Sequence, residues 1–263
     1  MGKKSLSGSF SNDLNLVKTD SKCARMVLSN NLPVRSGCKD VWNAFMAEGA
    51  VFGIHDIPFC PTTAITIPNH MVTWEEAKQI HKKHLVHGDT DYHEDAFVNW
   101  YIDDIKFDGP HGIWHDHNTA LKILCHFAGV ITPDWSTYQD FPEAIKIYST
   151  YRMRTYGYWL GKKGIAVINN VRWGTEESYS YCFEGIPTNS IVAIGTVGGG
   201  PRKLIDRQRF RAGFFKMIET LRPHTILVYG SSNDDCFTAA IKMGIHVISF
   251  QSKTDKFFDG RKS

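Results

Sequence analysis

The chain has 263 residues, of which 42% are hydrophobic and 13% aromatic, so it can bury a sizeable core. Its formal net charge of +3 is too small to indicate a dedicated nucleic-acid-binding protein, and no apolar run is long enough to cross a membrane. The N-terminus lacks the apolar segment of a secretory signal and the six cysteines form no C-x-x-C pair, so we expect a cytoplasmic protein with reduced thiols and no membrane partner.

Residues 1–30 are rich in Ser, Asn, Asp and Lys, and we predict a poorly ordered N-terminal arm there. Residues 31–263 are predicted to form a single domain in which strand-like and helix-like patterns alternate. The predicted strands are Val51–Ile57, Phe97–Phe107, Gly129–Pro133, Ile165–Val171, Ile191–Thr196, Thr225–Tyr229 and His246–Phe250. The predicted helices begin at a Thr73 capping box or cover Asn118–Phe127, Pro142–Leu160, Thr175–Phe183, Arg207–Leu221 and Asp234–Met243.

Several of these strands are continuous apolar runs, which is typical of strands that are buried on both faces. Because strands and helices alternate along the chain, the sequence predicts an α/β fold with a parallel sheet and flanking helices. The sheet is either barrel-like or an open three-layer sheet, and the pattern favours the barrel-like form slightly.

The most informative stretch is a glycine-rich turn between the fifth predicted strand and the next predicted helix. Its candidate binding residues are Gly198, Gly199, Gly200, Arg202 and Lys203. Glycine lets backbone N–H groups approach an anion, a helix N-terminus adds partial positive charge, and the two cations add full charge. We therefore predict a site for a phosphate or a similar anion. The alternative is a glycine turn with solvated cations.

Ligands of parallel α/β folds bind at the carboxyl ends of the strands, so polar residues that follow the predicted strands are also candidates. The further predicted ligand-binding residues are Asn169, Arg172, Trp173, Tyr229 and Ser231. Among them, Trp173 is the candidate for stacking against a base, whereas most other aromatic residues are expected in the core.

Three aspartates, Asp56, Asp104 and Asp134, stand at or near the ends of predicted strands. Converging carboxylates can hold Mg²⁺, so we predict these three as metal ligands and Mg²⁺ as the candidate cofactor. Asp104 and Asp134 are also predicted to be catalytic, with Arg152 stabilising developing charge. Arg152 and Arg154 do not share a helix face, so the other of the two is expected to face water. The structural alternative is that these aspartates cap helices and turns.

Several blocks of sequence form a recognisable series. They are Thr132–Pro142, Tyr151–Leu160, Gly164–Pro187, Val192–Gly198 and Leu221–Gly230, with Tyr101–Asp104 as a further strand motif. Together they resemble the bacterial and phage family of domain of unknown function 4417 (DUF4417), over roughly residues 95–250. The resemblance implies a bacterial or phage source and a cytosolic protein, often from a mobile element. It implies no activity.

Two functions from different classes remain open. The first is a phage or mobile-element protein that binds a phosphate-bearing ligand, either a nucleotide or a nucleic acid, with or without Mg²⁺-dependent hydrolysis. The second is a non-enzymatic binding or inhibitory protein that acts on a host or phage partner through the same site at the carboxyl ends of the strands. The sequence identifies neither the ligand nor a protein partner.

Overall fold

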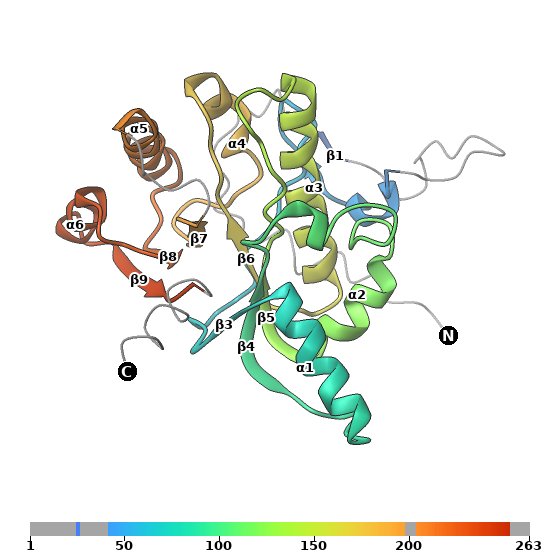
Figure 1. Ribbon diagram of the computed structural model, residues 1–263. Coiled ribbons are helices and arrows are strands. Elements are labelled where there is room, and N and C mark those ends of the chain that lie inside the picture. Colours follow the sequence, from blue (N-terminus) through green and yellow to red (C-terminus); the bar gives the residue numbers. More distant parts are fainter. Residues whose placement is uncertain (1–24, 27–41, 198–203, 253–263) are drawn as a thin grey trace, which may run out of the picture.

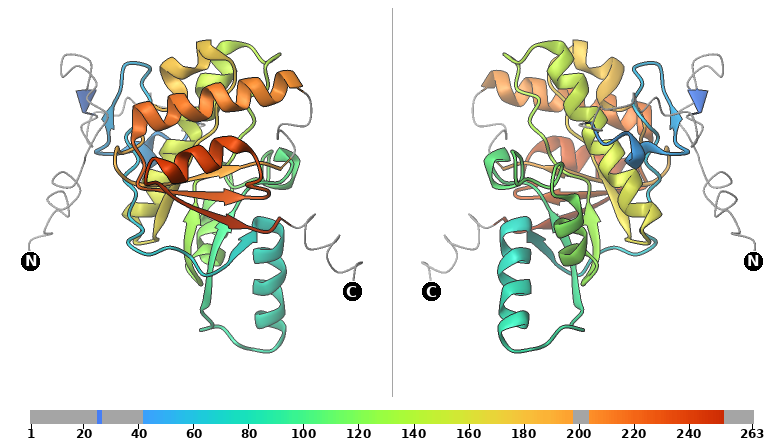
Figure 2. Two further views of the ribbon diagram at one scale, coloured as in Figure 1. Left: turned by 90° about the vertical axis from the view of Figure 1, so that its left-hand side faces the viewer. Right: turned by 90° about the vertical axis from the view of Figure 1, so that its right-hand side faces the viewer.

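The structure, a computed structural model, describes residues 25–26, 42–197 and 204–252. Within these ranges, seven parallel strands form one sheet that curls into a half-barrel, with α-helices around its outer face (Figures 1 and 2). The predicted α/β fold with a parallel sheet is therefore confirmed, in the barrel-like rather than the open form. The predicted N-terminal arm, residues 1–30, lies outside the described residues except for 25–26.

The strands of the sheet lie in chain order, and each neighbouring pair is parallel. They are β3 (Met71–Thr73), β4 (Glu94–Asn99), β5 (Phe127–Ile131), β6 (Val167–Asn170), β7 (Ile191–Gly195), β8 (Thr225–Tyr229) and β9 (His246–Phe250). The α-helices of the described residues are α1 (Trp74–Val86), α2 (His117–Leu124), α3 (Glu143–Lys162), α4 (Tyr179–Cys182), α5 (Leu204–Leu221) and α6 (Asp235–Lys242). Because all the strands run the same way, their carboxyl ends lie along one edge of the half-barrel.

The inner face of the half-barrel is filled by side chains of the strands themselves. One hydrophobic cluster includes Phe97, Ile168 and Leu227 from three strands, and none of its residues belongs to a described α-helix. Two strand glycines make room for large rings in this space. A Cβ at Gly129 would collide with the Phe97 ring, and a Cβ at Gly195 would lie 2.5 Å from the Tyr101 ring.

Two further clusters join the outer face of the sheet to the helices. Helices α1, α2 and α3 cover one part of the sheet through residues such as Val130 and Leu160. Helices α5 and α6 cover the other part through residues such as Val192, Phe214 and Phe237 (Figure 2). None of the helices in the described ranges has the length and apolar character needed to cross a bilayer.

The predicted strand Val51–Ile57 is wrong as a member of the main sheet. Only β2 (Val51–Phe52) is a strand there, and it pairs antiparallel with β1 (Arg25–Met26). Asp56 has a φ of 60°, so the chain turns where the pattern predicts extended backbone. The main sheet instead begins with β3, which was not predicted because a run of three residues carries no readable period.

The predicted strand Phe97–Phe107 is also too long at its C-terminal end. The strand ends at Asn99, and Asp104–Lys106 forms a 3-10 helix. Trp100 and Phe107 are buried by packing of the connecting loop, so their apolar character does not report extended backbone. The later strands and helices are present where the sequence predicts them, with shifted ends.

Candidate functional site

The carboxyl ends of β4, β5 and β6 bring a buried polar network together. Asp134 follows β5, and its side chain is 14% exposed. Its Oδ2 accepts a hydrogen bond from Arg172 Nη1 at 2.7 Å, and its Oδ1 accepts one from Asn170 Nδ2 at 2.8 Å. The Tyr101 hydroxyl in turn donates to Asn170 Oδ1 at 3.0 Å. Side chains from three neighbouring strand ends are thereby held in fixed positions.

The end of β6 is fixed from the outer face by Arg154 of α3. This fully buried guanidinium donates from Nη1, Nη2 and Nε to the carbonyl oxygens of Asn170, Cys182 and Glu184, at 3.0, 3.1 and 3.2 Å respectively. Burial lowers the pKa of Arg154 to about 10, so the side chain remains a cation at neutral pH. On the other side, the Asn170 N–H donates to Thr132 Oγ1 at 2.8 Å. Arg154 therefore positions the strand that carries the network.

Burial shifts the pKa values of two groups in the network, the Asp134 carboxyl group and the Tyr101 hydroxyl group. Burial raises the pKa of Asp134, against the opposing effects of Arg172 and of the Asn170 hydrogen bond, and nearby Asp104 raises it further. Burial also raises the pKa of Tyr101 well above its usual value, with Asp134 adding to the effect. A buried carboxyl group with a raised pKa in a polar cluster is a recurrent feature of functional sites.

Asn99 provides an unused hydrogen-bond donor at the end of β4. Its side chain is fully buried, and its Oδ1 accepts a hydrogen bond from the Tyr101 N–H at 3.2 Å. Its Nδ2 has no hydrogen-bond partner among the described residues. Because a buried donor without an acceptor is destabilising, this amide is suited to an acceptor that is supplied by a bound molecule.

Of the three predicted metal ligands, two lie near each other and one lies apart. The Asp104 carboxylate accepts hydrogen bonds from the Ser136 N–H and hydroxyl, both at 2.9 Å, and it affects the pKa of Asp134. Asp56 lies in the exposed turn after β2, outside the main sheet. Among the described residues, no group of three or more His, Cys, Asp or Glu side chains is arranged to hold a metal ion.

Arg152, predicted to stabilise developing charge, is engaged by other groups. Its Nη1 donates to Asp108 Oδ2 at 2.8 Å, and its guanidinium lies over the rings of Trp135 and Tyr148 at 4.5 and 5.0 Å. Its side chain is only 13% exposed. The expectation that one of Arg152 and Arg154 faces water is therefore wrong, because backbone carbonyl groups bind Arg154, and a carboxylate and two aromatic rings contact Arg152.

Asn169 and Trp173 point away from the network. Successive side chains on a strand alternate between faces, so Asn169 lies opposite Asn170, and its Nδ2 donates to the Cys60 carbonyl at 2.8 Å. The Trp173 ring packs against Phe210 of α5, with the ring centroids 5.3 Å apart. Asn169 and Trp173 therefore contact other parts of the protein and not the network. Residues two apart on a strand share a face, so Asn170 lies on the same inner face as Ile168. This alternation is the sequence signal that could have identified Asn170 in place of Asn169.

The remaining predicted residues lie near the ends of β7 and β8. The Tyr229 ring stacks on the Tyr101 ring at 5.4 Å inside the half-barrel, and the Ser231 carbonyl accepts a hydrogen bond from Thr196 Oγ1 at 3.0 Å. The five residues of the glycine-rich turn lie outside the described residues, namely Gly198, Gly199, Gly200, Arg202 and Lys203. The segment to which they belong connects the carboxyl end of β7 to α5.

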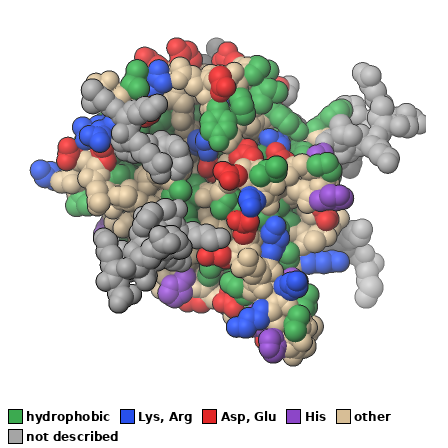
Figure 3. Space-filling model, in the orientation of Figure 1, with side chains coloured by type: hydrophobic (Ala, Val, Ile, Leu, Met, Phe, Trp, Pro, Cys, Tyr) green, Lys and Arg blue, Asp and Glu red, His purple; other side chains and the backbone are tan. Residues whose placement is uncertain are grey.

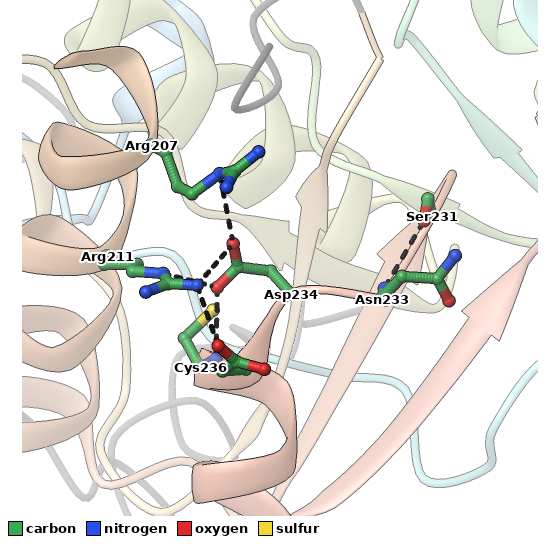
Figure 4. A network of polar contacts seen from close by, with 7 residues as sticks. Arg207, Arg211, Ser231, Asn233, Asp234 and Cys236 are labelled. Atoms are coloured by element: carbon green, nitrogen blue, oxygen red, sulfur yellow. Dashed lines mark hydrogen bonds and ion pairs between the residues drawn. The ribbon is translucent and has the colours of Figure 1, made fainter. Parts of the chain in front are cut away.

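Helices α5 and α6 are locked together by an ion-pair network (Figure 4). Arg211 donates to both carboxylate oxygens of Asp234, at 2.8 and 3.2 Å, and Arg207 lies 4.0 Å from the same carboxylate. Asp234 also caps α6 by accepting a hydrogen bond from the Cys236 N–H at 3.1 Å. Although partial burial opposes it, hydrogen bonds from Arg211 and Cys236 hold the pKa of Asp234 below its usual value. This network fixes the first turns of α5, which follow the glycine-rich turn.

The family model described as Domain of unknown function (DUF4417) matches residues 50–251. The chain belongs to the DUF4417 family. The resemblance that the sequence blocks indicate is therefore confirmed, and the match includes every strand of the half-barrel from β3 to β9.

Two relatives of this DUF4417 protein come from phages. It is 27% identical over 164 residues to the Gene 1 protein of Mycobacterium phage L5, which covers 62% of this chain and 66% of the relative. It is 30% identical over 133 residues to the Gene 1 protein of Mycobacterium phage D29, which covers 51% of this chain and 48% of the relative. The chain thus spans about half to two thirds of the length of these relatives. No solved structure matches it.

Proposed function

We propose that this DUF4417 protein binds a small phosphate-bearing ligand at the carboxyl edge of the half-barrel. The observation that carries the proposal is the fixed network of Asp134, Arg172, Asn170 and Tyr101 at this edge. Beside it lies the Asn99 Nδ2, which has no hydrogen-bond partner in the described part of the chain. Parallel α/β folds bind ligands at this edge, and a few convergent polar groups on rigid elements are typical of small-molecule sites.

The phosphate group is assigned to the connection between β7 and α5. Its glycines and its two cations suit an anion, and α5 begins directly after it at Leu204. Arg207 and Arg211 lie in the first three turns of α5, where their charge is shared with Asp234. The opposite part of the edge, with Asn99 and Asp134, then contacts the rest of the ligand.

A small molecule is favoured over a nucleic-acid polymer. Figure 3 shows acidic side chains near the centre of the face seen in Figure 1, with hydrophobic side chains above them and basic side chains below. Polymer binding needs a continuous basic surface that neutralises several phosphates. The acidic side chains at the centre of this face interrupt its basic side chains, which favours a small ligand over a polymer.

Mg²⁺-dependent hydrolysis stays a prediction. Mg²⁺ is commonly bound through one or two carboxylates together with the phosphates of a substrate, so Asp104 and Asp134 suit a metal that arrives with the ligand. When bound there, Mg²⁺ would polarise a phosphoryl oxygen. Both carboxylates already accept hydrogen bonds within the protein, and this observation favours non-enzymatic binding as the second candidate function.

The experiment is a thermal-shift screen of inorganic phosphate, ribose 5-phosphate and nucleotides, each in Mg²⁺ and in EDTA. A ligand at about 100 times its Kd stabilises the fold by about 2.7 kcal/mol, which raises the Tm of a chain of this size by roughly 5–10 °C. We expect Asp134→Asn to reduce this shift and the exposed control Asp140→Asn to retain it. If no phosphate-bearing compound moves the Tm, the proposal is wrong.

Phosphate release then separates the two classes of function. An enzyme releases phosphate from the compound that binds, in Mg²⁺ but not in EDTA, and Asp104→Asn removes turnover while the thermal shift remains. A binding protein shows the thermal shift with no release under either condition.

A further inference from the structure

The exposed aromatic side chain at the candidate site is Tyr138. It lies in the segment that follows β5 and also carries Asp134 and Ser136, and it is 55% exposed. An exposed ring beside this network offers a face on which another aromatic group can stack. The predicted stacking residue, Trp173, is packed against α5 and leaves no comparable surface.

The Tyr138 ring is held in a defined orientation. The Arg172 guanidinium lies over the ring, 5.8 Å from its centroid, while the same side chain bonds Asp134. The Phe141 ring lies perpendicular to it at 5.3 Å. Both contacts leave a large part of the ring accessible, so the ring is oriented without being covered.

The segment around Tyr138 is fixed at several points. Trp135 is fully buried, the Ser136 N–H and hydroxyl bind Asp104, and the Gln139 Oε1 accepts a hydrogen bond from Arg209 Nη1 of α5 at 2.6 Å. The Lys146 ammonium donates to the Gln139 carbonyl at 2.7 Å. A ring on a segment fixed in this way loses little conformational entropy when a ligand stacks on it.

We propose that Tyr138, backed by Arg172, stacks against the aromatic base of the bound ligand, which is therefore a nucleoside phosphate. The inference rests on the proposed function and names the ligand class of that same site. The Asn99 Nδ2, which has no hydrogen-bond partner among the described residues, lies at the end of the neighbouring strand β4 and is the donor offered to the polar edge of a base.

The test compares three variants by titration calorimetry with a nucleoside monophosphate and with ribose 5-phosphate. Tyr138→Ala removes the ring, Tyr138→Phe keeps it, and Tyr148→Ala is the matched control, since Tyr148 is also partly exposed and also lies under an arginine. Base–aromatic stacking predicts that Tyr138→Ala weakens nucleotide binding by about ten- to a hundred-fold. We expect Tyr138→Phe and Tyr148→Ala to change it by less than about three-fold, and ribose 5-phosphate binding to be the same in all variants.

The possible results separate this inference from the proposed function. If ribose 5-phosphate binds the wild type as tightly as the nucleotide does, or if Tyr138→Ala leaves nucleotide binding unchanged, stacking is excluded while a phosphate site stands. If Tyr138→Ala weakens both compounds equally, the ring has a structural role and the inference is also wrong. If the wild type binds neither compound, nor any other phosphate-bearing molecule, both proposals fall.

Discussion

Arg154 is the residue on which the geometry of the candidate site most depends. A fully buried guanidinium without a carboxylate partner is rare, because its charge is removed from water. Here it is compensated by the carbonyl oxygens of Asn170, Cys182 and Glu184. These three carbonyls come from the end of β6 and from the chain around α4, so one side chain ties two segments that no backbone ladder joins.

We expect Arg154→Met to lower the free energy of unfolding by about 3 kcal/mol. The substitution keeps much of the volume but leaves buried carbonyl groups without donors. Urea denaturation followed by circular dichroism measures the change. The matched control is Lys163→Met near the end of the same helix, where the side chain is exposed and the expected change is within about 0.5 kcal/mol. A loss of similar size in both variants would contradict the role given to Arg154.

At the scale of elements, the joint between α1, β4 and β5 is built from histidine rings around Tyr92. The Tyr92 ring stacks on His84 at 4.0 Å and on His126 at 4.2 Å. The Tyr92 hydroxyl is hydrogen-bonded to His81 Nδ1 at 2.9 Å, and the His81 and His126 rings are 5.5 Å apart. Burial lowers the pKa of His81, and the neighbouring His126 and His84 lower it further.

The joint makes the stability of the protein depend on pH. A lowered pKa means that the folded protein binds this proton less readily than the unfolded chain does, whose His81 titrates near its usual 6.5. The contribution is complete above pH 6.5 and is lost as the pH falls toward the lowered pKa. His117, whose pKa is also lowered by burial, acts in the same direction. We therefore expect the urea midpoint to fall between about pH 7.5 and 5.5.

Substitution of His81 tests whether the histidines around Tyr92 cause part of this fall in the urea midpoint. In His81→Gln, which cannot titrate, the midpoint should fall less over the same interval, whereas the exposed control His246→Gln should follow the wild type. A wild-type midpoint that is constant or rises toward pH 5.5 would contradict this account.

Pattern reasoning succeeded for the elements whose period is readable and failed for those that tertiary contacts define. The strands β8 and β9 and the long helix α3 are apolar or amphipathic over enough residues to be recognised. The strand β3 was missed because its three residues form a strand only by pairing with β4. The stretch Val51–Ile57 was misassigned because the turn at Asp56 depends on a positive φ that the pattern does not show.

The candidate site was predictable to the same degree. The position of Asp134 and Arg172 at the carboxyl edge follows from topology and residue type, whereas their predicted metal-binding, catalytic and ligand-binding roles stay predictions. Asn99 and Tyr101 were missed because the second predicted strand was drawn past its true end at Asn99. The packing of Trp173 was also hidden, since it depends on Gly213 of α5, where a Cβ would collide with the indole ring.

At the scale of the whole molecule, apolar side chains fill the interior of the half-barrel, and polar side chains gather at the carboxyl edge of its strands. Its interior is closed by rings and branched side chains, so the fold offers a ligand an edge rather than a channel. The charges at this edge are largely compensated within the protein, as Arg172 with Asp134 and Arg152 with Asp108. Among the described residues, these arginines at the edge are paired with carboxylates, and the anion site proposed above is the connection between β7 and α5.

This distribution of charge predicts a weak dependence of ligand binding on salt. A ligand held through one or two phosphates releases few counterions, so its log K should fall with log salt with a slope no steeper than about −1.5 between 50 and 300 mM NaCl. A single-stranded 20-nucleotide oligomer, measured by fluorescence anisotropy, should show no binding below about 100 µM protein at 150 mM NaCl, which is the weak limit of non-specific binding. A nucleotide panel by calorimetry at the same salt concentrations gives the comparison. Micromolar binding of the oligomer with a slope of about −4 or steeper would instead assign the edge to a polymer, because about six phosphates of a single strand would then have to be neutralised together.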